Sequence, residues 1–352
     1  MPSPTDSLRP VSGTADGILA LLREWDAATD PAPLVVATSG STGRPKRVVL
    51  SRDAVRASAL ATQERLGGPG QWVLGLPPTY VAGVQVLYRS VVAGTAPVRH
   101  DGDWQETAAR VHGRGYVSLV PTQLVRLLRD DATGPTLEAL ARFDAVLVGG
   151  GPLDPRVRAE AERRGLRVVQ TYGMSETCGG CVYDGVPLEG VRVDLADDSR
   201  VRIAGPMIMS GYLDEGPVGP WLATQDLGHW QSGRLVIDGR IDDVINSGGL
   251  KIAAGQVLDQ IRATGMVRDG LVLGLADATW GQVVTAVVVP GRGWRGPEAL
   301  RDLVGRRLGR THAPRVIVEV DELPMLASGK IDRVEVRRIT TATLESGAAW
   351  RV

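Results

Sequence analysis

Short apolar runs alternate with helix-like segments through the first half of the 352-residue chain. The runs that predict buried strands are residues 34–37, 71–76, 116–120, 145–148 and 166–169. Between them, residues 121–130 and 154–164 carry the mixed pattern of helices, and a short amphipathic helix is predicted near residues 17–25. Because strands alternate with helices, we expect an α/β fold with a mostly parallel sheet.

The pattern changes near residue 191. From there to residue 237, short β-like pieces separated by Gly and Asp turns predict a small antiparallel sheet. The elements expected beyond residue 242 are helices at 254–263 and 297–308 and strands at 270–275, 283–289 and 315–320. We therefore expect a large N-terminal domain over residues 1–241 and a small α+β C-terminal domain over residues 242–352.

Charge excludes several classes of partner. Forty Lys and Arg residues balance forty Asp and Glu residues, so nucleic acid and anionic membranes are poor candidates. The chain has no run of eighteen apolar residues and no signal-peptide pattern at its N-terminus, so we expect a cytoplasmic protein. Only three of the forty basic residues are Lys, and each lies in a Gly-containing stretch: Lys46, Lys251 and Lys330.

A loop rich in Gly and hydroxyl side chains follows the predicted strand at 34–37. Its residues include Thr38, Ser39, Gly40, Ser41, Thr42, Gly43 and Lys46. Backbone N–H groups, hydroxyl donors and an ammonium on one turn form a cradle for phosphate oxygens. The loop is not the P-loop of NTPases, because Lys46 lies between Pro45 and Arg47 instead of between Gly and a hydroxyl residue. The alternative is a solvated Ser/Gly loop without a ligand.

A second cluster, residues 170–177, follows the predicted strand at 166–169. Its Tyr172 can stack on a base, its hydroxyl side chains can contact phosphate, and Glu176 can hold Mg²⁺ through oxygen. Upstream, the three Gly of Gly149–Gly151 end another strand and allow a flat ligand to approach the backbone. Each string could equally be an ordinary turn, so neither identifies a site by itself.

Two further Gly-containing segments lie downstream. The first begins at Asp226 and continues through residues 238–251, and the second spans residues 323–333. In this order, the segments together resemble the adenylate-forming superfamily of acyl-CoA synthetases, peptide-synthetase adenylation domains and luciferases. The parts that look most like 2-succinylbenzoate–CoA ligases of menaquinone biosynthesis are residues 76–83, 87–90 and 119–128.

The resemblance implies an AMP-forming acid–thiol ligase that works in two half-reactions. ATP and a carboxylate give an acyl-adenylate and pyrophosphate, and a thiol then displaces AMP to form a thioester. The substrates and cofactors implied are ATP, Mg²⁺, coenzyme A and a carboxylic acid, with 2-succinylbenzoate as the expected acid. Because an anionic carboxylate attacks a polyphosphate, catalysis should consist mainly of positioning and charge neutralisation.

The resemblance also implies roles for single residues. The loop of residues 38–46 would hold the β- and γ-phosphates, and Tyr172 would stack on adenine beside Gly149–Gly151. Glu176 would ligate Mg²⁺, and Thr177 would approach the α-phosphate. The residues expected at the ribose are Asp226 and Arg240, and those expected in the acid pocket are Tyr80, Val81, Gly83, Gly173 and Met174.

By the same resemblance, the C-terminal domain is mobile and carries groups for both steps. Lys330 would bridge the carboxylate and the α-phosphate, where a compact ammonium suits a cluster of oxygens. Asp242 matches the hinge about which the domain swings between the half-reactions. In the second conformation Gly249 would let the thiol pass, and Lys330 would be carried away. The residues expected along this thiol channel are Ser247, Gly248, Gly249 and Lys251.

The chain departs from the family pattern in three places. It is shorter than most relatives before the phosphate loop, so either a pared-down first subdomain or a partner surface in its place is expected. Tyr80 stands where many relatives place His, which bears on the identity of the acid. Gln225 stands where Gly is common before the ribose Asp.

Several alternatives stay open from the sequence alone. A stand-alone adenylation enzyme would load the acyl group onto a carrier protein instead of coenzyme A. A non-catalytic nucleotide-binding module is a further alternative from another class, although a mere binder needs neither Lys330 nor Glu176. Assembly into a homodimer is open as well. The pair Cys178 and Cys181 is expected to be two reduced cysteines, because a lone C-x-x-C is a poor zinc site.

Overall fold

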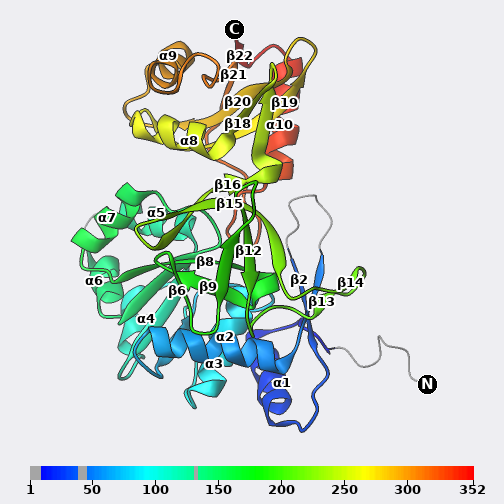
Figure 1. Cartoon of the computed structure of the whole chain (residues 1–352). Coiled ribbons are helices and arrows are strands. Elements are labelled where there is room, and N and C mark those ends of the chain that lie inside the picture. The colour runs from blue at the N-terminus through cyan, green and yellow to red at the C-terminus, as the bar shows by residue number, and fades with distance from the viewer. Residues whose placement is uncertain (1–8, 39–45, 131–133) are drawn as a thin grey trace.

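The computed structural model describes residues 9–38, 46–130 and 134–352. It has two parts placed end to end, a larger part built by the chain up to about residue 240 and a smaller part built by the rest (Figure 1). Among the described residues, every helix is too short or too polar to cross a bilayer.

A seven-stranded sheet forms the centre of the larger part. Its strands are β4 (Gln71–Leu74), β5 (Val98–Arg99), β6 (Gly115–Leu119), β7 (Ala145–Gly149), β8 (Val168–Met174), β9 (Gly179–Tyr183) and β10 (Val186–Pro187). The five strands β4 to β8 are parallel, whereas β9 and β10 are antiparallel. The expected mostly parallel sheet is therefore confirmed. The strand predicted at 166–169 instead runs to Met174, because its second half pairs with β9.

Helices cover both faces of this sheet. They are α1 (Ala15–Ala27), α2 (Arg52–Arg65), α3 (Val81–Val92), α4 (Trp104–Ala109), α5 (Pro121–Asp130), α6 (Pro135–Ala141) and α7 (Pro155–Arg163). Alternate residues of the central strands β4 and β7 belong to different cores, so Trp72 faces α1 to α3 while Val73 faces α4 to α6. The rings of Trp25 and Tyr88, 5.7 Å apart, join α1 to α3. The helix expected near 17–25 is α1, whose first turn is capped by Thr14.

Two smaller sheets complete the larger part. One contains β1 (Arg9–Pro10), β2 (Leu34–Ala37), β3 (Arg47–Leu50), β13 (Gly211–Tyr212) and β14 (Gly216–Pro217). The other contains β11 (Arg192–Leu195), β12 (Arg200–Ala204), β15 (Leu222–Gln231) and β16 (Arg234–Arg240), all antiparallel. The antiparallel sheet predicted between 191 and 237 is thus confirmed.

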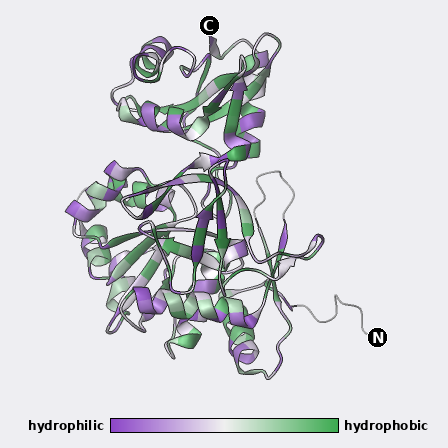
Figure 2. Cartoon of the chain, viewed as in Figure 1, coloured by the Kyte–Doolittle hydropathy of each residue, from purple (hydrophilic) through white to green (hydrophobic). Residues whose placement is uncertain are grey.

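The smaller part has a mixed sheet with its own core. Its elements are β17 (Val244–Ser247), β18 (Leu250–Ala253), α8 (Ala254–Ala263), β19 (Val267–Asp277), β20 (Gly281–Pro290), α9 (Pro297–Leu308), β21 (Val316–Glu319), α10 (Arg333–Glu345) and β22 (Trp350–Arg351). Val284 and Val288 face α8 and α9, whereas Val283 and Val287 face α10. Hydrophobic residues predominate on these buried strands (Figure 2). The expected α+β fold is confirmed, while α10 and the β17–β18 hairpin were not predicted.

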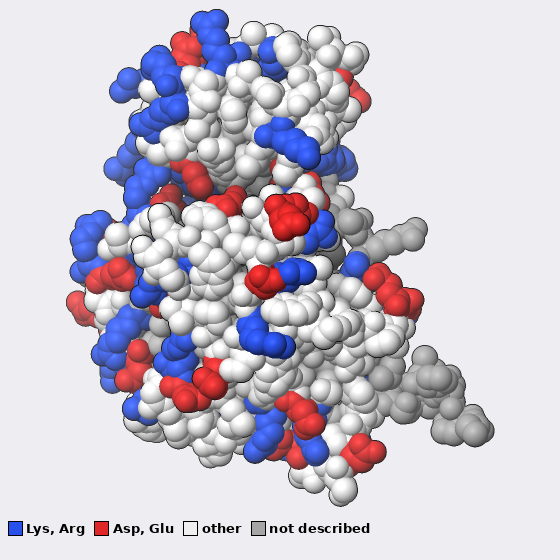
Figure 3. Space-filling model, in the orientation of Figure 1, with Lys and Arg blue, Asp and Glu red and all other residues white. Residues whose placement is uncertain are grey.

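Charged side chains mark the junction of the two parts. After β16 the chain passes through a 3₁₀ turn, Ile241–Asp243, before it enters β17. Arg240 binds both carboxylate oxygens of Asp242 at 2.8 Å, and Asp243 pairs with Arg333 at the start of α10. Acidic side chains gather at this junction in Figure 3. The division between residues 241 and 242 and the mobility of the smaller part stay predictions.

Candidate active site

Lys330 of the smaller part lies against the larger part. A Cβ added to Gly150, at the end of β7, would be 3.1 Å from Lys330 Cε and 3.8 Å from Nζ. One residue earlier, the carbonyl oxygen of Gly329 accepts a 2.7 Å hydrogen bond from the hydroxyl of Thr122. The carboxyl ends of parallel strands share one edge of a sheet, and Lys330 is therefore placed at the edge where ligands of α/β folds bind.

The surroundings of Lys330 weaken its hold on a proton. Lys330 is exposed to solvent, although one side of its side chain lies beside Gly150 of the larger part. The loss of hydration lowers the pKa of Lys330, and the nearby positive charge of Arg240 lowers it further. The carboxylate of Glu176 acts in the opposite direction. An anionic ligand at this position would favour the ammonium form of Lys330.

A tyrosine that no sequence pattern indicated links Glu176 to the predicted phosphate loop, residues 38–46. The hydroxyl of Tyr212 donates a 2.7 Å hydrogen bond to Glu176 Oε1, while the Lys46 ammonium lies 4.2 Å from the centre of the Tyr212 ring. Lys46 also forms a 3.3 Å ion pair with Glu215. Tyr212 follows Gly211 on β13, which pairs with β3, and the juxtaposition depends on this sheet.

Of the phosphate loop itself, the structure describes only the two ends. Thr38 and Lys46 close the hairpin formed by β2 and β3, with a 2.9 Å bond from Thr38 N to Lys46 O. The Thr38 hydroxyl accepts from the amide of Lys46 at 3.2 Å. The predicted phosphate contacts of Ser39, Gly40, Ser41, Thr42 and Gly43 lie outside the described residues.

The residues expected at adenine and ribose are directly connected. The hydroxyl of Tyr172 donates a 2.7 Å hydrogen bond to Asp226 Oδ2, and Arg240 lies 3.4 Å from Asp226 Oδ1. Burial raises the pKa of Asp226, although the Tyr172 hydroxyl and the Arg240 charge both favour its ionised form. Burial alone would also raise the pKa of Asp242, but its bonds to Arg240 hold it below the ordinary value.

Close backbone approach explains several glycines at this edge. A Cβ on Gly149 would lie 2.1 Å from Thr171 Oγ1, and one on Gly173 would lie 2.0 Å from the carbonyl oxygen of Gly179. Gly150 has a φ of +82°, which a side chain would strain. Gly151 instead lies near Pro121 at the start of α5. The turn after β7 and the β8–β9 pair therefore tolerate no larger residue at Gly149 or Gly173.

The hydroxyl of Thr177, expected near the α-phosphate, is bonded to the protein backbone. Its side chain is fully buried, and its hydroxyl accepts from the Met174 amide at 2.9 Å and bonds to Gly179 O at 2.6 Å. These bonds close the 3₁₀ turn of residues 175–177. The Ser175 hydroxyl, in contrast, has no protein partner among the described residues, so it is the hydroxyl of this turn free to meet a ligand. The α-phosphate contact of Thr177 stays a prediction.

Three of the residues expected in the acid pocket lie at the start of α3, whereas Gly173 and Met174 end β8. Tyr80 precedes this helix, and Val81 and Gly83 lie in its first turn. A Cβ on Gly83 would lie 2.2 Å from the carbonyl oxygen of Pro77, so the helix packs directly on the preceding turn. Farther along the helix, Gln85 is buried beside Gly179, which places α3 next to the turn that holds Glu176.

The expected thiol-channel residues form a separate hairpin in the smaller part. Ser247 ends β17, and Gly248 and Gly249 make the turn with φ values of +57° and +82°. The Gly248 amide donates to Trp280 O at 2.9 Å, while Gly249 has open space around it. Lys251 is exposed on β18. In the described chain, none of the hairpin's hydrogen bonds joins it to Lys330 or Glu176.

Thiol chemistry and a protein-only metal centre receive no support. Cys178 and Cys181 are both fully buried, and desolvation raises the pKa of Cys181 to about 12. Within the described ranges, no group of three or more His, Cys, Asp and Glu side chains is placed to hold a metal ion.

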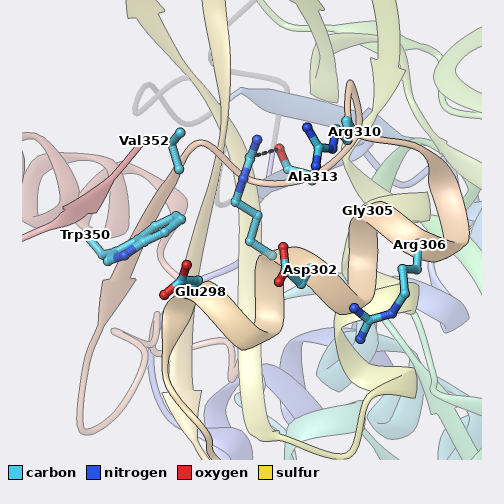
Figure 4. Close-up of a pocket in the computed structure, with 9 residues that line it drawn as sticks. Glu298, Asp302, Gly305, Arg306, Arg310, Ala313, Trp350 and Val352 are labelled. Carbon is cyan, nitrogen blue, oxygen red and sulfur yellow. Dashed lines mark hydrogen bonds between the residues drawn. The ribbon is translucent and has the colours of Figure 1, made fainter.

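A cavity of about 460 Å³ lies away from this edge, between α9 and the segments that follow it (Figure 4). Glu298 and Asp302 project from α9 on one side, with Trp350 and Val352 across from them. None of the described residues predicted for the site lines this cavity, so it has no place in the chemistry of the site.

Comparison with known proteins places the chain in one family. The family described as AMP-binding enzyme matches residues 11–213, and its C-terminal domain matches residues 261–330. A probable 2-succinylbenzoate–CoA ligase of Mycobacterium tuberculosis is 43% identical over 343 residues, which cover 92% of this chain and 88% of the relative. The 2-succinylbenzoate–CoA ligase of Enterococcus faecalis is 30% identical, over 84% of this chain and 67% of the relative.

Solved structures give the same result. The o-succinylbenzoate CoA synthetase (MenE) of Bacillus subtilis, in complex with the acyl-adenylate intermediate OSB-AMP, superposes with a TM-score of 0.75 at 27% identity. The similarity covers 86% of this chain and 68% of that one. An amide bond synthetase, McbA from Marinactinospora thermotolerans, matches with a TM-score of 0.75 at 28% identity. With matches of this length and identity, the chain belongs to the AMP-binding enzyme family.

Proposed function

We propose that the chain is an ATP-dependent 2-succinylbenzoate–CoA ligase, which forms 2-succinylbenzoyl-adenylate and then the coenzyme A thioester. The observation that carries the proposal is the position of Lys330, which lies beside Gly150 in the field of Glu176. The named activity of the M. tuberculosis and E. faecalis relatives supports the choice of acid and acceptor. A nucleotide-binding module would have no use for an ammonium held in this way.

In the first half-reaction, a carboxylate oxygen bonds to the α-phosphorus of ATP and the α–β anhydride bond breaks, which releases pyrophosphate. Lys330 would bridge the carboxylate and the α-phosphate and so neutralise charge where it accumulates. Tyr172 would stack on adenine beside Gly149–Gly151, and Asp226 would accept hydrogen bonds from the ribose hydroxyls. Because this step transfers no proton, it needs no general base.

The residues present fit a Mg²⁺ ion that is shared with the nucleotide. Mg²⁺ is usually bound by one or two carboxylates together with substrate phosphates, and Glu176 offers one carboxylate beside the phosphate loop. Its second oxygen, Oε2, has no hydrogen-bond partner among the described residues, while Oε1 accepts from Tyr212. When bound, the ion would supply further neutralisation of phosphate charge. Tyr212 would hold the Glu176 carboxylate in place.

For the second half-reaction, we propose a hinge at Asp242, with domains of residues 1–241 and 242–352. The smaller part would swing so that Lys330 leaves and the Gly248–Gly249 turn faces the adenylate. The thiol sulfur then bonds to the acyl carbon, the bond to AMP breaks, and the thiol proton passes to solvent. The open space around Gly249 supports its role as the passage for the thiol.

Pyrophosphate exchange with a panel of aromatic and dicarboxylic acids tests this function. We expect exchange to depend on 2-succinylbenzoate, and free coenzyme A to release AMP from the enzyme-bound adenylate. Exchange without AMP release by coenzyme A would favour an adenylation enzyme that loads a carrier protein. ATP binding without exchange by any acid would leave only a nucleotide-binding module.

The pH dependence of exchange should report the ionisation of Lys330. The ammonium is required, so the rate is lost as pH rises through the Lys330 pKa, which burial holds below the ordinary lysine value of about 10.4. A bound triphosphate favours the ammonium, so the alkaline limb of kcat should lie at higher pH than that of kcat/KM. Because coenzyme A is absent from the exchange assay, ionisation of its thiol cannot cause this limb. Lys330→Arg should lack this limb, and an identical limb in that variant would contradict the assignment.

The proposed setting is the cytoplasm, with small molecules rather than nucleic acid or membranes as partners. A homodimer is the proposed assembly, and light scattering during gel filtration decides between it and a monomer.

A further inference from the structure

The loop that carries Lys330 contacts the larger part at a small seat, formed by Val120, Thr122 and Gly150. The Thr122 hydroxyl donates to Gly329 O at 2.7 Å. A Cβ on Gly329 would lie 2.9 Å from Val120 Cγ2, and Gly150 contacts the Lys330 side chain. Three residues of one part thus meet two consecutive residues of the other.

The seat is fixed independently of the loop. Gln123 Oε1 accepts from the Val120 amide at 2.9 Å, and Gln123 Nε2 donates to Gly75 O, after β4, at 3.2 Å. Leu124 is fully buried in the core between α5 and the large sheet. The start of α5, and Thr122 with it, is therefore held against two strands of the sheet whatever the position of the smaller part.

The loop that carries Lys330 is a turn closed by its own backbone hydrogen bonds. The amide of Leu326 donates to Lys330 O at 2.8 Å, and the amide of Gly329 donates to Leu326 O at 2.9 Å. Met325 and Ile331 form a β-bridge at its base, and Gly329 has a φ of +77°. Because Gly329 and Lys330 move together, a hydrogen bond to Gly329 O sets the place of the Lys330 backbone.

We propose that Thr122 is a positioning residue for Lys330, a latch that holds the smaller part in the orientation for adenylate formation. The latch joins α5 of one part to a loop of the other, so a swing of the smaller part must break it. The Thr122–Gly329 hydrogen bond therefore stabilises the orientation used in the first half-reaction relative to the one used in the second. This inference rests on the proposed two-step function and adds to it the contact that sets the balance between the two orientations.

Thr122→Val removes the hydroxyl at nearly constant volume. With 2-succinylbenzoate and ATP both saturating, we expect pyrophosphate exchange to slow about three- to tenfold, as for the loss of one hydrogen bond. The KM for ATP should change little, because Tyr172 and Asp226 lie elsewhere. Thioester formation from supplied acyl-adenylate should stay at the wild-type rate or rise, and Thr122→Ser should restore exchange.

Thr95→Val is the matched control, since Thr95 also donates to a Gly carbonyl, Gly70 O at 3.3 Å, but away from the seat. It should leave both half-reactions unchanged. An equal loss of both half-reactions in Thr122→Val, together with a lower melting temperature, would give Thr122 a merely structural role and overturn the proposal. An unchanged exchange rate would overturn it as well.

Amide hydrogen exchange tests the latch independently of the proposed enzymatic activity. In the enzyme without substrates, the larger part lies against this turn while the latch is closed and opposes opening of its hydrogen bonds, so Thr122→Val should speed exchange at the amides of Leu326 and Gly329, whereas Thr95→Val should not. This readout needs no turnover, so it tests the latch even if wild-type enzyme fails to use 2-succinylbenzoate. Equal protection of these amides in wild type and Thr122→Val would refute it.

Discussion

Lys330→Ala should slow adenylate formation about a hundred- to a thousandfold, the loss typical when one preorganised group that stabilises transition-state charge is removed. The ammonium lies beside Gly150 in the field of Glu176, whereas Lys46 pairs with Glu215 and Lys251 is exposed on β18. Thioester formation from supplied acyl-adenylate should remain near the wild-type rate. Both rates can be measured separately, by pyrophosphate exchange and by thioester release.

Arg338→Ala provides the control for removal of a positive charge from the same part of the chain. Arg338 is exposed on α10 and pairs with Glu335, three residues away. Exposed ion pairs of this kind contribute little to the stability of a protein, so both half-reactions should be unaffected. An equal loss of both half-reactions in Lys330→Ala would refute the separation of roles, because a group used in one orientation cannot limit the other.

Gly249→Leu should produce the reverse pattern. The leucine would occupy the open space at the Gly248–Gly249 turn and keep the thiol from its proposed position, and a misplacement of this kind slows a reaction about a hundredfold. Pyrophosphate exchange should persist, since the hairpin makes no hydrogen bond to the Lys330 site in the described residues. Coenzyme A turnover is the measurement, and a normal rate would remove Gly249 from the thiol route.

Backbone strain must be separated from this steric effect. Gly249 has a φ of +82°, so leucine there also adopts an unfavourable conformation. Gly265→Leu is the matched control, because Gly265 has a φ of +70° and likewise has nothing within 4 Å of an added Cβ. It lies after α8, away from the hairpin turn, and should reduce stability similarly while coenzyme A turnover continues.

Much of the fold could be predicted from local patterns. The helices at 254–263 and 297–308 agree with α8 and α9, and strand β7 differs from its prediction by one residue. Strand β8 was predicted too short, since residues 170–174 contain no apolar run and are a strand through pairing with β7 and then with β9. Helix α10 was not predicted, because its sequence is rich in Val, Ile and Thr, which are β-branched and favour strands.

Only some of the residues at the candidate site could be predicted from the sequence. Tyr172, Asp226 and Arg240 were each expected at the nucleotide, and the structure joins them by hydrogen bonds. Tyr212 was missed because it lies in none of the segments singled out, and Thr122 because residues 119–128 supported the resemblance only as a whole, with no role for a single residue. Tyr212 is near Glu176 only because β13 pairs with β3, and a Gly-Tyr pair alone gives no signal of that contact.

By itself, the sequence determined the order of elements and the residue types available for chemistry, because both depend on local periodicity and on side-chain character. It singled out three lysines among forty basic residues. Only the tertiary structure decided that Lys330 meets Gly150 and that Lys46 lies over Tyr212. These contacts join residues far apart in the chain, and their distances follow from strand pairing and from the seating of one part on the other, which no local pattern encodes.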